Sequence, residues 1–185
     1  MRIADCREAA RLLLADKKLL SSVEGIAKKI AECYRSGGKV ILMGNGGSAS
    51  QAMHIAAEFE GRYLRERRPL QALALGANIA STTAIGNDYD FTRVFVRQLE
   101  ACAKKGDVVI ALSTSGNSPN VVEAAKYAKS VGIFTAAFVG KKNCHLDPIA
   151  DVSVKVPSDE TPRIQEMHLL LLHGICEAVE NELFS

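Results

Sequence analysis

The stretch KVILMGNGGSASQAMHIAAEFEGR, residues 39–62, decides the fold class. It opens with apolar and β-branched residues, continues through a glycine-rich turn and ends in a long helical pattern. Such a strand–loop–helix unit is the building block of a parallel sheet. Ligands of these sheets bind where loops leave the carboxyl ends of the strands, so the polar residues of this turn are the first candidates for chemistry.

The same order recurs along the chain. DVVIALSTSGNSPNVVEAAKYAKSVG, residues 107–132, is again a strand, a polar loop and a helix. Short apolar segments predict further strands, and periodic segments predict further helices, the last one starting at Thr161 and Pro162. The fold expected is a three-layer α/β arrangement, a flavodoxin-like or Rossmann-like parallel sheet with helices on both faces. The additional strands are expected at residues 70–76, 133–140 and 151–157, and the helices near 78–86 and over 161–183.

Apolar residues at helical spacing over residues 3–35, with charges between them, predict an N-terminal helical extension that stops at Ser36-Gly37-Gly38. The length of 185 residues suits one domain. We therefore expect a single domain over residues 1–185, with helices over 1–36 and an α/β core with its closing helix over 37–185.

Composition excludes several classes of protein. The hydrophobic fraction of 48% and the charged fraction of 24% are typical of a globular chain and exclude disordered and fibrous classes. A net charge of +2 gives no reason to expect nucleic acid or a membrane surface as partner. No apolar run approaches the roughly 18 residues of a membrane span, and charges interrupt the start where a signal peptide needs an apolar stretch. The five scattered cysteines form no CxxC, which argues against a disulfide framework or zinc ribbon and favours the cytoplasm.

The first loop, Gly44-Asn45-Gly46-Gly47-Ser48-Ala49, fits the dinucleotide pattern G-x-G-x-x-A. That interpretation needs an acidic residue at the end of the next strand, and residues 75–78 supply no carboxylate. No Gly-Lys-Ser/Thr follows either, so the loop is not a Walker loop. A nucleotide site is disfavoured.

The second loop, Ser113-Thr114-Ser115-Gly116-Asn117-Ser118, lies between a strand and a helix that has Pro119 in its first turn. Hydroxyl groups and free backbone N–H groups at a helix N-terminus suit a phosphate. The alternative is that Ser118 is only an N-cap in a polar turn. Four hydroxyls in six residues exceed what capping requires, so we favour phosphate binding.

Candidate acids, bases and metal ligands lie on two helices. His54 and Glu58 are four residues apart and share a helix face, and the last helix carries Gln165, His168 and His173. A lone histidine on a helix is more often a packed or surface residue than a ligand. Gln165 and His173 are separated by about 12 Å along a straight helix. If both serve one ion, a neighbouring subunit supplies one of them. The arginines of the run 62–68 are interpreted as a solvated turn.

Together, GNGGSASQAMHIAAEFEGR, AIGNDYDF, LSTSGNSPNV and RIQEMHLLLLHG resemble the phosphoheptose isomerases of the sugar isomerase (SIS) domain superfamily. The resemblance covers nearly the whole chain. It implies isomerisation of sedoheptulose 7-phosphate to D-glycero-D-manno-heptose 7-phosphate, an entry to bacterial heptose and lipopolysaccharide synthesis. It also implies a homotetramer with active sites between subunits, to which residues 1–36 would contribute, and one zinc ion per subunit.

The resemblance also assigns residues. The zinc ligands fall on His54, Glu58, Gln165 and His173. The substrate contacts fall on Asn45, Gly46, Gly47, Glu58, Asn87, Asp88, Ser113, Thr114, Ser115, Ser118 and Gln165. One position departs from the family pattern: Asp90 stands where glycine is common. Its carboxylate either lies near the expected sugar phosphate, which it would repel, or points to solvent.

An aldose–ketose isomerisation through an enediol needs a base that reaches two carbons and a partner that moves protons between two oxygens. We expect Glu58 to be that base and His173 its acid–base partner. Zinc coordination would lower the pKa of Glu58 and weaken it as a base, so the two assigned roles compete. Two alternatives stay open: a non-catalytic SIS-fold module that binds a replication initiator protein, and an isomerase of another sugar phosphate.

Overall fold

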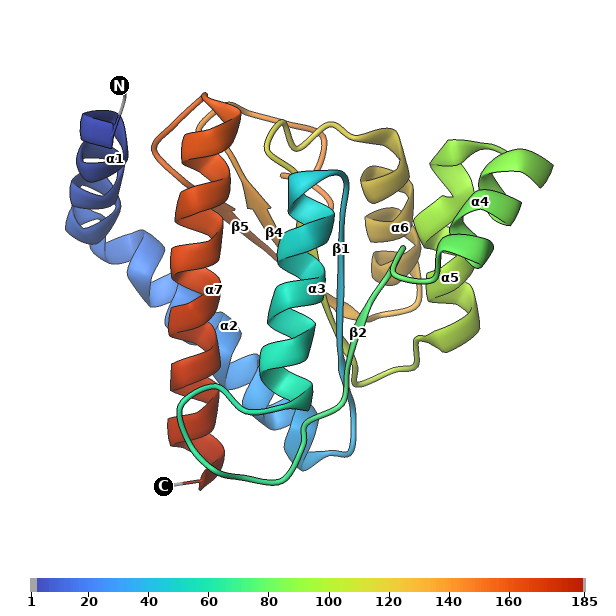
Figure 1. Ribbon diagram of the computed structural model, residues 1–185, viewed down its shortest axis with the longest axis horizontal. Helices are drawn as coiled ribbons and strands as arrows, with labels where there is room; N and C mark the ends of the chain where they lie inside the picture. The colour runs from blue at the N-terminus through green and yellow to red at the C-terminus, as the bar shows by residue number, and fades with distance from the viewer. Residues whose placement is uncertain (1–2, 185) are drawn as a thin grey trace.

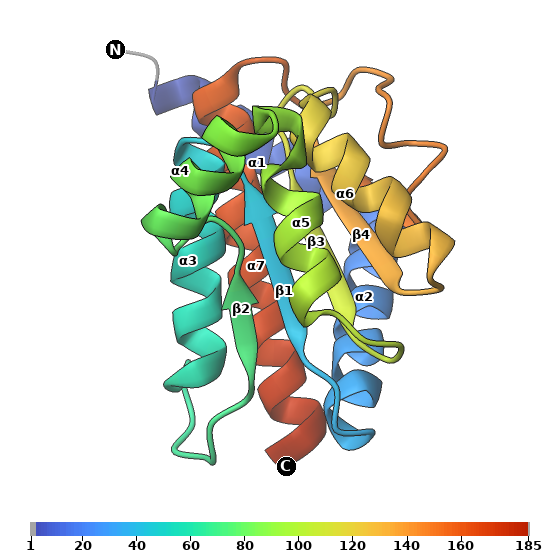
Figure 2. The same cartoon turned by 90° about the vertical axis from the view of Figure 1, so that its right-hand side faces the viewer.

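The computed structural model describes residues 3–184 and contains a five-stranded sheet with all strands parallel, in the order β2-β1-β3-β4-β5 (Figures 1 and 2). Met1, Arg2 and Ser185, which belong to the expected domain, lie outside the described residues. The strands are β1 (Val40–Gly44), β2 (Ala72–Ala74), β3 (Val108–Leu112), β4 (Phe134–Val139) and β5 (Val152–Lys155). The helices are α1 (Ile3–Ala15), α2 (Lys17–Arg35), α3 (Gly47–Glu60), α4 (Ile79–Asp88), η1 (Phe91–Arg93), α5 (Val94–Cys102), α6 (Pro119–Ser130) and α7 (Thr161–Phe184).

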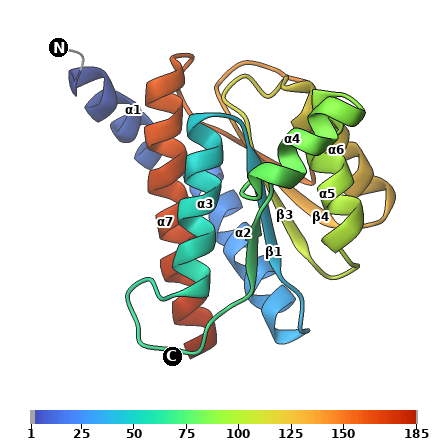
Figure 3. The same cartoon turned by 45° about the vertical axis from the view of Figure 1, so that its right-hand side comes forward.

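Helices cover both faces of this sheet, which confirms the predicted three-layer α/β fold. Helices α2, α3 and α7 lie on one face and α5 and α6 on the other (Figures 2 and 3). Alternation along β1 explains the two cores: Val40 and Leu42 pack toward α2, α3 and α7, whereas Ile41 and Met43 pack toward α5 and α6. Every residue of β1 and β3 is buried, as in a central strand of a parallel sheet.

The strand order reverses at β1, because β2 pairs with one of its edges and β3 with the other. Gly44 at the end of β1 lies opposite Leu112 at the end of β3, so the loops that follow these strands leave the sheet side by side. A β-carbon on Gly44 would lie 2.7 Å from the β-carbon of Ser48, and this close approach requires glycine. The topology therefore places both polar loops at the switch point, where α/β sheets bind ligands.

The helical pattern of residues 3–35 is interrupted once. Asp16 separates α1 from α2 and acts as the N-cap of α2, since its side chain accepts a hydrogen bond from the N–H of Leu19 at 2.9 Å. The periodicity predicted helical structure over residues 3–35, which is confirmed, but it did not place the break at this residue. Helix α5 and the short η1 were also not predicted, and β2 occupies only three of the seven residues expected for it.

Two expectations drawn from the sequence, on disulfides and on membrane spans, can be compared with the structure. All five cysteines are free thiols. Over residues 3–184, no helix combines the length and apolar character that crossing a membrane requires.

Candidate active site

The serine loop, residues 113–118, joins β3 to α6. The Ser113 hydroxyl is buried, accepts the N–H of Gly116 at 3.1 Å and lies 3.1 Å from the hydroxyl of Ser118. Ser118 occupies the N-cap position of α6, but its side chain makes no capping hydrogen bond. Capping therefore does not account for this serine, and its hydroxyl faces the loop. Gly116 has a φ of +66°, which lets the loop turn tightly against Cys144.

A reciprocal amide pair ties the first loop to the serine-loop helix. The Asn45 side-chain amide donates to Asn120 Oδ1 at 2.8 Å, and the Asn120 amide donates back to Asn45 Oδ1 at 2.9 Å. Asn120 is 2% exposed, and its Oδ1 also accepts the N–H of Val121 at 3.0 Å. The pair locks the two loops together at the switch point. It also means that the Asn45 side chain, an expected substrate contact, already has a protein partner.

The N-terminus of α3 meets the N-terminal half of α7. A β-carbon on Gly47 would lie 2.6 Å from Nε2 of Gln165, so this side chain lies directly over the glycine. Gln51, one turn along α3, donates to the Gln165 carbonyl at 2.6 Å. Within one chain, the Gln165 side chain therefore lies beside the first loop. This is the end of the molecule that also carries the serine loop, and we call it the serine-loop end.

A hollow of about 220 Å³ opens beside the serine loop. Thr114, Ser115 and the first turn of α7 line it, together with Lys141 and Lys142 from the loop after β4. Lys141 is paired with Asp159 at 3.0 Å. Asp159 lines the hollow as well, so the groups here that suit an anionic ligand are the hydroxyls and Lys142.

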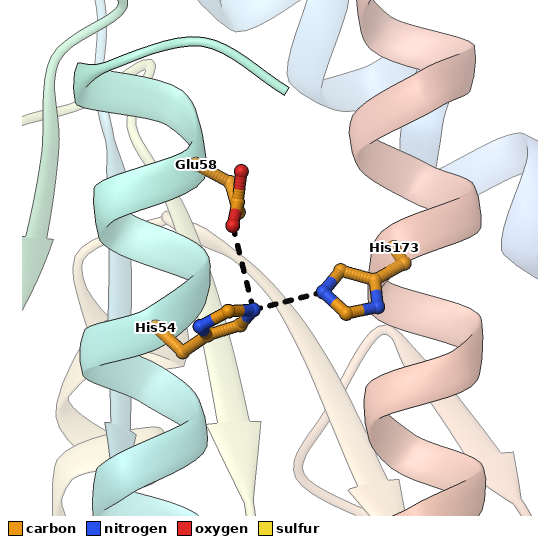
Figure 4. A group of neighbouring side chains, drawn as sticks. All are labelled: His54, Glu58 and His173. Carbon is orange, nitrogen blue, oxygen red and sulfur yellow. Dashed lines mark hydrogen bonds and ion pairs between the residues drawn. The ribbon is translucent and has the colours of Figure 1, made fainter. Parts of the chain in front are cut away.

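Three of the four expected metal ligands meet at a second place. His54 and Glu58 project from α3 and His173 from α7 (Figure 4). The Nε2 atoms of the two histidines are 2.9 Å apart, and Glu58 Oε1 lies 3.4 Å from His54 Nε2. One ligand atom from each residue lies within 4.8 Å of the other two. Gln165 is not in this cluster: it lies about 12 Å back along α7, eight residues before His173.

The donor set fits a zinc ion. Two imidazole nitrogens and a carboxylate oxygen are ordinary zinc ligands, and ligand atoms of a tetrahedral site lie about 3.3 Å apart. The cluster is open on one side, because the His54 side chain is 48% exposed. Partial burial and the neighbouring His54 lower the pKa of His173, while Glu58 acts in the opposite direction. A low pKa favours the neutral imidazole that a metal needs.

Arg62, Arg65 and Arg68 of the run after α3 are exposed, as expected for a solvated turn, but Arg67 is not. The Arg67 side chain is 1% exposed and pairs with Glu180 of α7 at 2.9 Å. The same loop brings Tyr63 onto His173, with ring centroids 5.4 Å apart and planes inclined by 17°. Sequence reasoning missed Tyr63, Arg67, Glu180 and Asn120. One signal for Glu180 was available, since it lies seven residues after His173 and therefore on nearly the same face of α7.

The remaining expected substrate contacts lie on a third element, α4. Asn87 and Asp88 are exposed at the end of α4, and Asn87 donates to Asp88 at 2.9 Å. Among the described residues, no hydrogen bond or ion pair joins them to the triad or the serine loop. Asp90 accepts the N–H of Thr92 at 2.7 Å and caps η1. Its φ of −170° is ordinary extended backbone, so the departure from glycine introduces no strain.

Comparison with known proteins identifies the family. A model of the SIS domain family matches residues 6–140. A phosphoheptose isomerase of Aliarcobacter butzleri is 51% identical over 158 residues, which cover 85% of this chain and 84% of that protein.

Two solved structures agree with this match. A phosphoheptose isomerase from Francisella tularensis superposes with a TM-score of 0.93 at 30% identity, and one from Neisseria gonorrhoeae with a TM-score of 0.90 at 37% identity. Each comparison covers 97% of this chain and 95% of the solved one. Both the family match and the closeness of the folds lead to one conclusion: the chain is an enzyme of the SIS domain family and belongs to its phosphoheptose isomerases.

Proposed function

We propose that this isomerase converts sedoheptulose 7-phosphate to D-glycero-D-manno-heptose 7-phosphate through an enediol, in the cytoplasm and in support of lipopolysaccharide synthesis. The observation that carries the proposal is the meeting of His54, Glu58 and His173, three groups capable of acid–base and metal chemistry, on two helices whose other ends flank a phosphate-type loop. A binding module without catalysis would have no use for this arrangement.

The proton transfers fall to Glu58 and His173. Glu58 removes a proton from C1 of the ketose, and the C–H electron pair becomes the C1–C2 double bond of an enediolate with its negative charge on the C2 oxygen. The neutral imidazole of His173 takes the proton of the C1 hydroxyl and passes it to the C2 oxygen. The C1 oxygen then re-forms a carbonyl as Glu58 delivers its proton to C2. Each residue ends as it began, and atoms and charge balance.

The carboxylate of Glu58 has two oxygens for its two roles. One oxygen lies in the cluster with His54 and His173, at 3.4 Å from His54 Nε2. We assign the proton transfer at carbon to the other oxygen. Zinc, held by these three residues, would supply Lewis-acid stabilisation of the negative charge that develops on the substrate oxygens.

The serine loop binds the phosphate. Ser113, Thr114, Ser115 and Ser118 present hydroxyl groups at the N-terminus of α6, where the helix dipole favours an anion. Gly46 leaves room for the sugar to approach the first loop, because a β-carbon there would meet nothing within 4 Å, and the Gln165 side chain lies directly over Gly47. In this proposal Asn45 contributes mainly through its backbone, because Asn120 engages its side-chain amide.

Assembly completes the site. Gln165 lies far from the triad of its own chain, and the triad has an exposed edge, so we propose that Gln165 of one subunit serves the triad of a neighbour as fourth zinc ligand and substrate contact. Asn87 and Asp88 of exposed α4 would likewise face a neighbouring site. The assembly is a homotetramer, in which residues 1–36 provide contacts and 37–185 carry the catalytic core.

An apolar groove supports this role of the N-terminal helices. It has a volume of about 350 Å³ and runs between α1, α2 and α7. Leu14 on its rim is 63% exposed and Leu170 is 47% exposed. Sedimentation of the wild-type protein and of Leu14→Glu tests the assignment: we expect a tetramer for the first and smaller species for the second.

Proton NMR of the purified protein with sedoheptulose 7-phosphate in D₂O, with and without zinc, tests the reaction. We expect an aldoheptose phosphate that carries deuterium at C2 when the abstracted proton exchanges with solvent, and a rate that rises with zinc. A folded, zinc-loaded sample that yields neither product nor exchange at C1 would refute this substrate. Activity on a hexulose phosphate would then favour another sugar-phosphate isomerase, and silence on both would favour a binding module.

A further inference from the structure

One buried carboxylate ties the loop that follows α3 to the end of α7. Glu180 is 2% exposed. Its Oε1 accepts the N–H of Tyr63 and the Nε–H of Arg67, both at 2.9 Å, and its Oε2 accepts the N–H groups of Leu64 and Arg65 at 2.9 and 3.0 Å. Burial raises the pKa of Glu180, but these four hydrogen bonds outweigh it and hold the pKa below its ordinary value. The carboxylate is therefore charged and fully partnered at neutral pH.

Arg67 extends this connection to the end of α3. Its Nη2 donates to the carbonyl of Glu58 at 2.8 Å, and its Nη1 donates to the carbonyls of Phe59 and Gly61 at 2.8 and 3.2 Å. The last carbonyls of a helix have no partner within the helix, and Arg67 satisfies them here. One of them belongs to Glu58 itself. Helix α3 is thus fixed, at the residue that carries the carboxylate ligand, to a group held by α7.

Tyr63 extends the same connection to the imidazole ligand of α7. Its backbone N–H is held by Glu180, and its ring stacks on the ring of His173 with 5.4 Å between centroids. The same imidazole meets His54 edge to face, at 5.1 Å between centroids. His173 therefore contacts both a ring that belongs to the triad and a ring whose backbone N–H is held by Glu180.

We propose that Glu180, Arg67 and Tyr63 are a positioning unit that pre-organises the metal ligands His54, Glu58 and His173. The inference rests on the metal site of the proposed function and adds residues that touch neither ion nor substrate. A metal site gains affinity when its ligands are already held at the right spacing and orientation, and loss of such supporting partners costs about 10–100-fold in metal affinity or activity. Here the spacing of α3 and α7 depends on Arg67 and Glu180, and the orientation of His173 depends on Tyr63.

The test is titration of the metal-free protein with Co²⁺, followed by visible absorption. Glu180→Gln preserves the side-chain volume but places an amide NH₂ against the backbone N–H groups that now donate to the carboxylate. We expect a folded protein whose dissociation constant for Co²⁺ rises about 10–100-fold and whose absorption bands change in shape or intensity. A folded Glu180→Gln protein with wild-type affinity and spectrum would overturn the proposal.

The chain supplies a matched control in another buried carboxylate. Asp107 precedes β3 and accepts the N–H groups of Lys39 and Lys104 and the ammonium of Lys39, at 3.0, 2.8 and 2.6 Å. It lies at the amino ends of the strands, at the opposite end of the sheet from the ligand loops. Asp107→Asn removes a comparable charge from a comparable set of donors. We expect lower stability with unchanged Co²⁺ affinity, which separates general destabilisation from positioning.

Tyr63 provides a second pair of variants that does not depend on the folding of Glu180→Gln. Tyr63→Phe keeps the stacked ring, and we expect wild-type Co²⁺ affinity and spectrum. Tyr63→Ala removes the ring from His173, and we expect weaker binding and an altered spectrum. If the two variants have the same Co²⁺ affinity and the same spectrum, stacking of Tyr63 on His173 does not position that ligand.

The outcome for the wild-type protein separates this inference from the proposed function. If wild-type protein binds Co²⁺ and Glu180→Gln binds it equally well, only the positioning unit fails. If wild-type protein binds no Co²⁺, the proposed metal site is wrong. The kcat of Glu180→Gln then tests whether Glu180 positions His173 and Glu58 for catalysis. In that case a Glu180→Gln enzyme with wild-type kcat and KM refutes positioning as well.

Discussion

The serine-loop end of the molecule and the histidine triad differ in how far one chain completes them. At the first, Ser113 and Asn120 are buried, and reciprocal hydrogen bonds join the loops after β1 and β3. At the second, the ligand cluster lies between α3 and α7, and the His54 side chain is 48% exposed. Within one chain, hydrogen bonds hold the phosphate-type loop in place. The triad, in contrast, has its ligands in position but is exposed to solvent on one side.

This contrast indicates a division of labour. A rigid, polar loop at a helix N-terminus suits the part of a substrate that does not change during reaction. The triad suits the reacting atoms, because its groups can hold a metal and move protons. Binding and turnover should therefore separate when each region is altered.

The largest effect is expected for Glu58→Gln. The substitution barely changes shape or volume but removes the base, and a positioned acid–base group contributes about 10²–10⁴-fold to rate. We expect kcat to fall at least about 100-fold with KM within a few-fold of wild type, measured by initial rates on sedoheptulose 7-phosphate. Retention of even a tenth of the wild-type rate would exclude Glu58 as the base.

Mixed assemblies test whether the two regions meet across subunits. Glu58→Gln damages the triad and Gln165→Ala damages the serine-loop end, so each homo-oligomer should be nearly inactive. If a site combines the two regions from different chains, random mixing of the two variants restores about one quarter of the sites. Co-expression with two affinity tags and an assay of the mixed species measures this.

The control for mixing pairs two variants of the same region. Glu58→Gln with His54→Ala leaves no intact triad in any assembly, and we expect no recovery. If the first mixture is also no more active than its parents, both regions of a site belong to one chain, and the shared arrangement proposed here is wrong.

A smaller effect is expected from the amide pair that makes the serine-loop end rigid. Asn120→Asp leaves Asn45 Oδ1 facing a carboxylate in place of an N–H donor. Loss of a partner at a buried polar group costs about 1–3 kcal/mol, so we expect KM to rise roughly tenfold. At low pH the introduced carboxyl gains a proton that it can donate to Asn45, and KM should return toward the wild-type value.

Asn117→Asp is the matched control, because it adds the same charge to the serine loop, three residues before Asn120. Asn117 uses its Oδ1 to accept the N–H of His145 at 2.8 Å, and an aspartate can accept that bond equally well. Steady-state kinetics of both variants across pH distinguish the effect of an added negative charge from the effect of losing the Asn45–Asn120 hydrogen bonds. Equal increases in KM would show that the cross-loop pair does not contribute.

The same contrast explains what the sequence could predict. The strands, the loops and the phosphate-type serine loop depend on local signals: apolar runs, glycines and hydroxyls close together in the chain. The parallel sheet then follows from the alternation of strands and helices, and the position of both loops follows from the sheet. The break at Asp16 was missed because one capping side chain overrides a periodic pattern on both sides of it.

The triad was only half predictable. His54 and Glu58 share a helix face by spacing, but their approach to His173 depends on the packing of α3 against α7. Arg67 shows the limit more sharply. In sequence it stands in a run of arginines typical of a solvated turn, and its partner Glu180 lies 113 residues away. A buried ion pair between two such distant positions leaves no local signal.

The smallest expected effect concerns His168, which lies on α7 between Gln165 and His173 and so links the two regions. It is fully buried and packs edge to face on Phe138. Burial lowers its pKa from 6.5 to about 4. Between these values the unfolded chain binds a proton that the folded chain does not. The free energy of unfolding therefore falls as pH drops below 6.5, by up to about 1.4 kcal/mol per pH unit, and the loss levels off below about 4.

His168→Leu should remove this slope, whereas His145→Gln at an exposed position should preserve it, as measured by urea denaturation at about pH 7 and about pH 5. Unchanged kcat and KM in folded His168→Leu at neutral pH would show that this part of α7 serves only as a rigid spacer between the two regions. A loss of activity there would instead make His168 part of the connection between them.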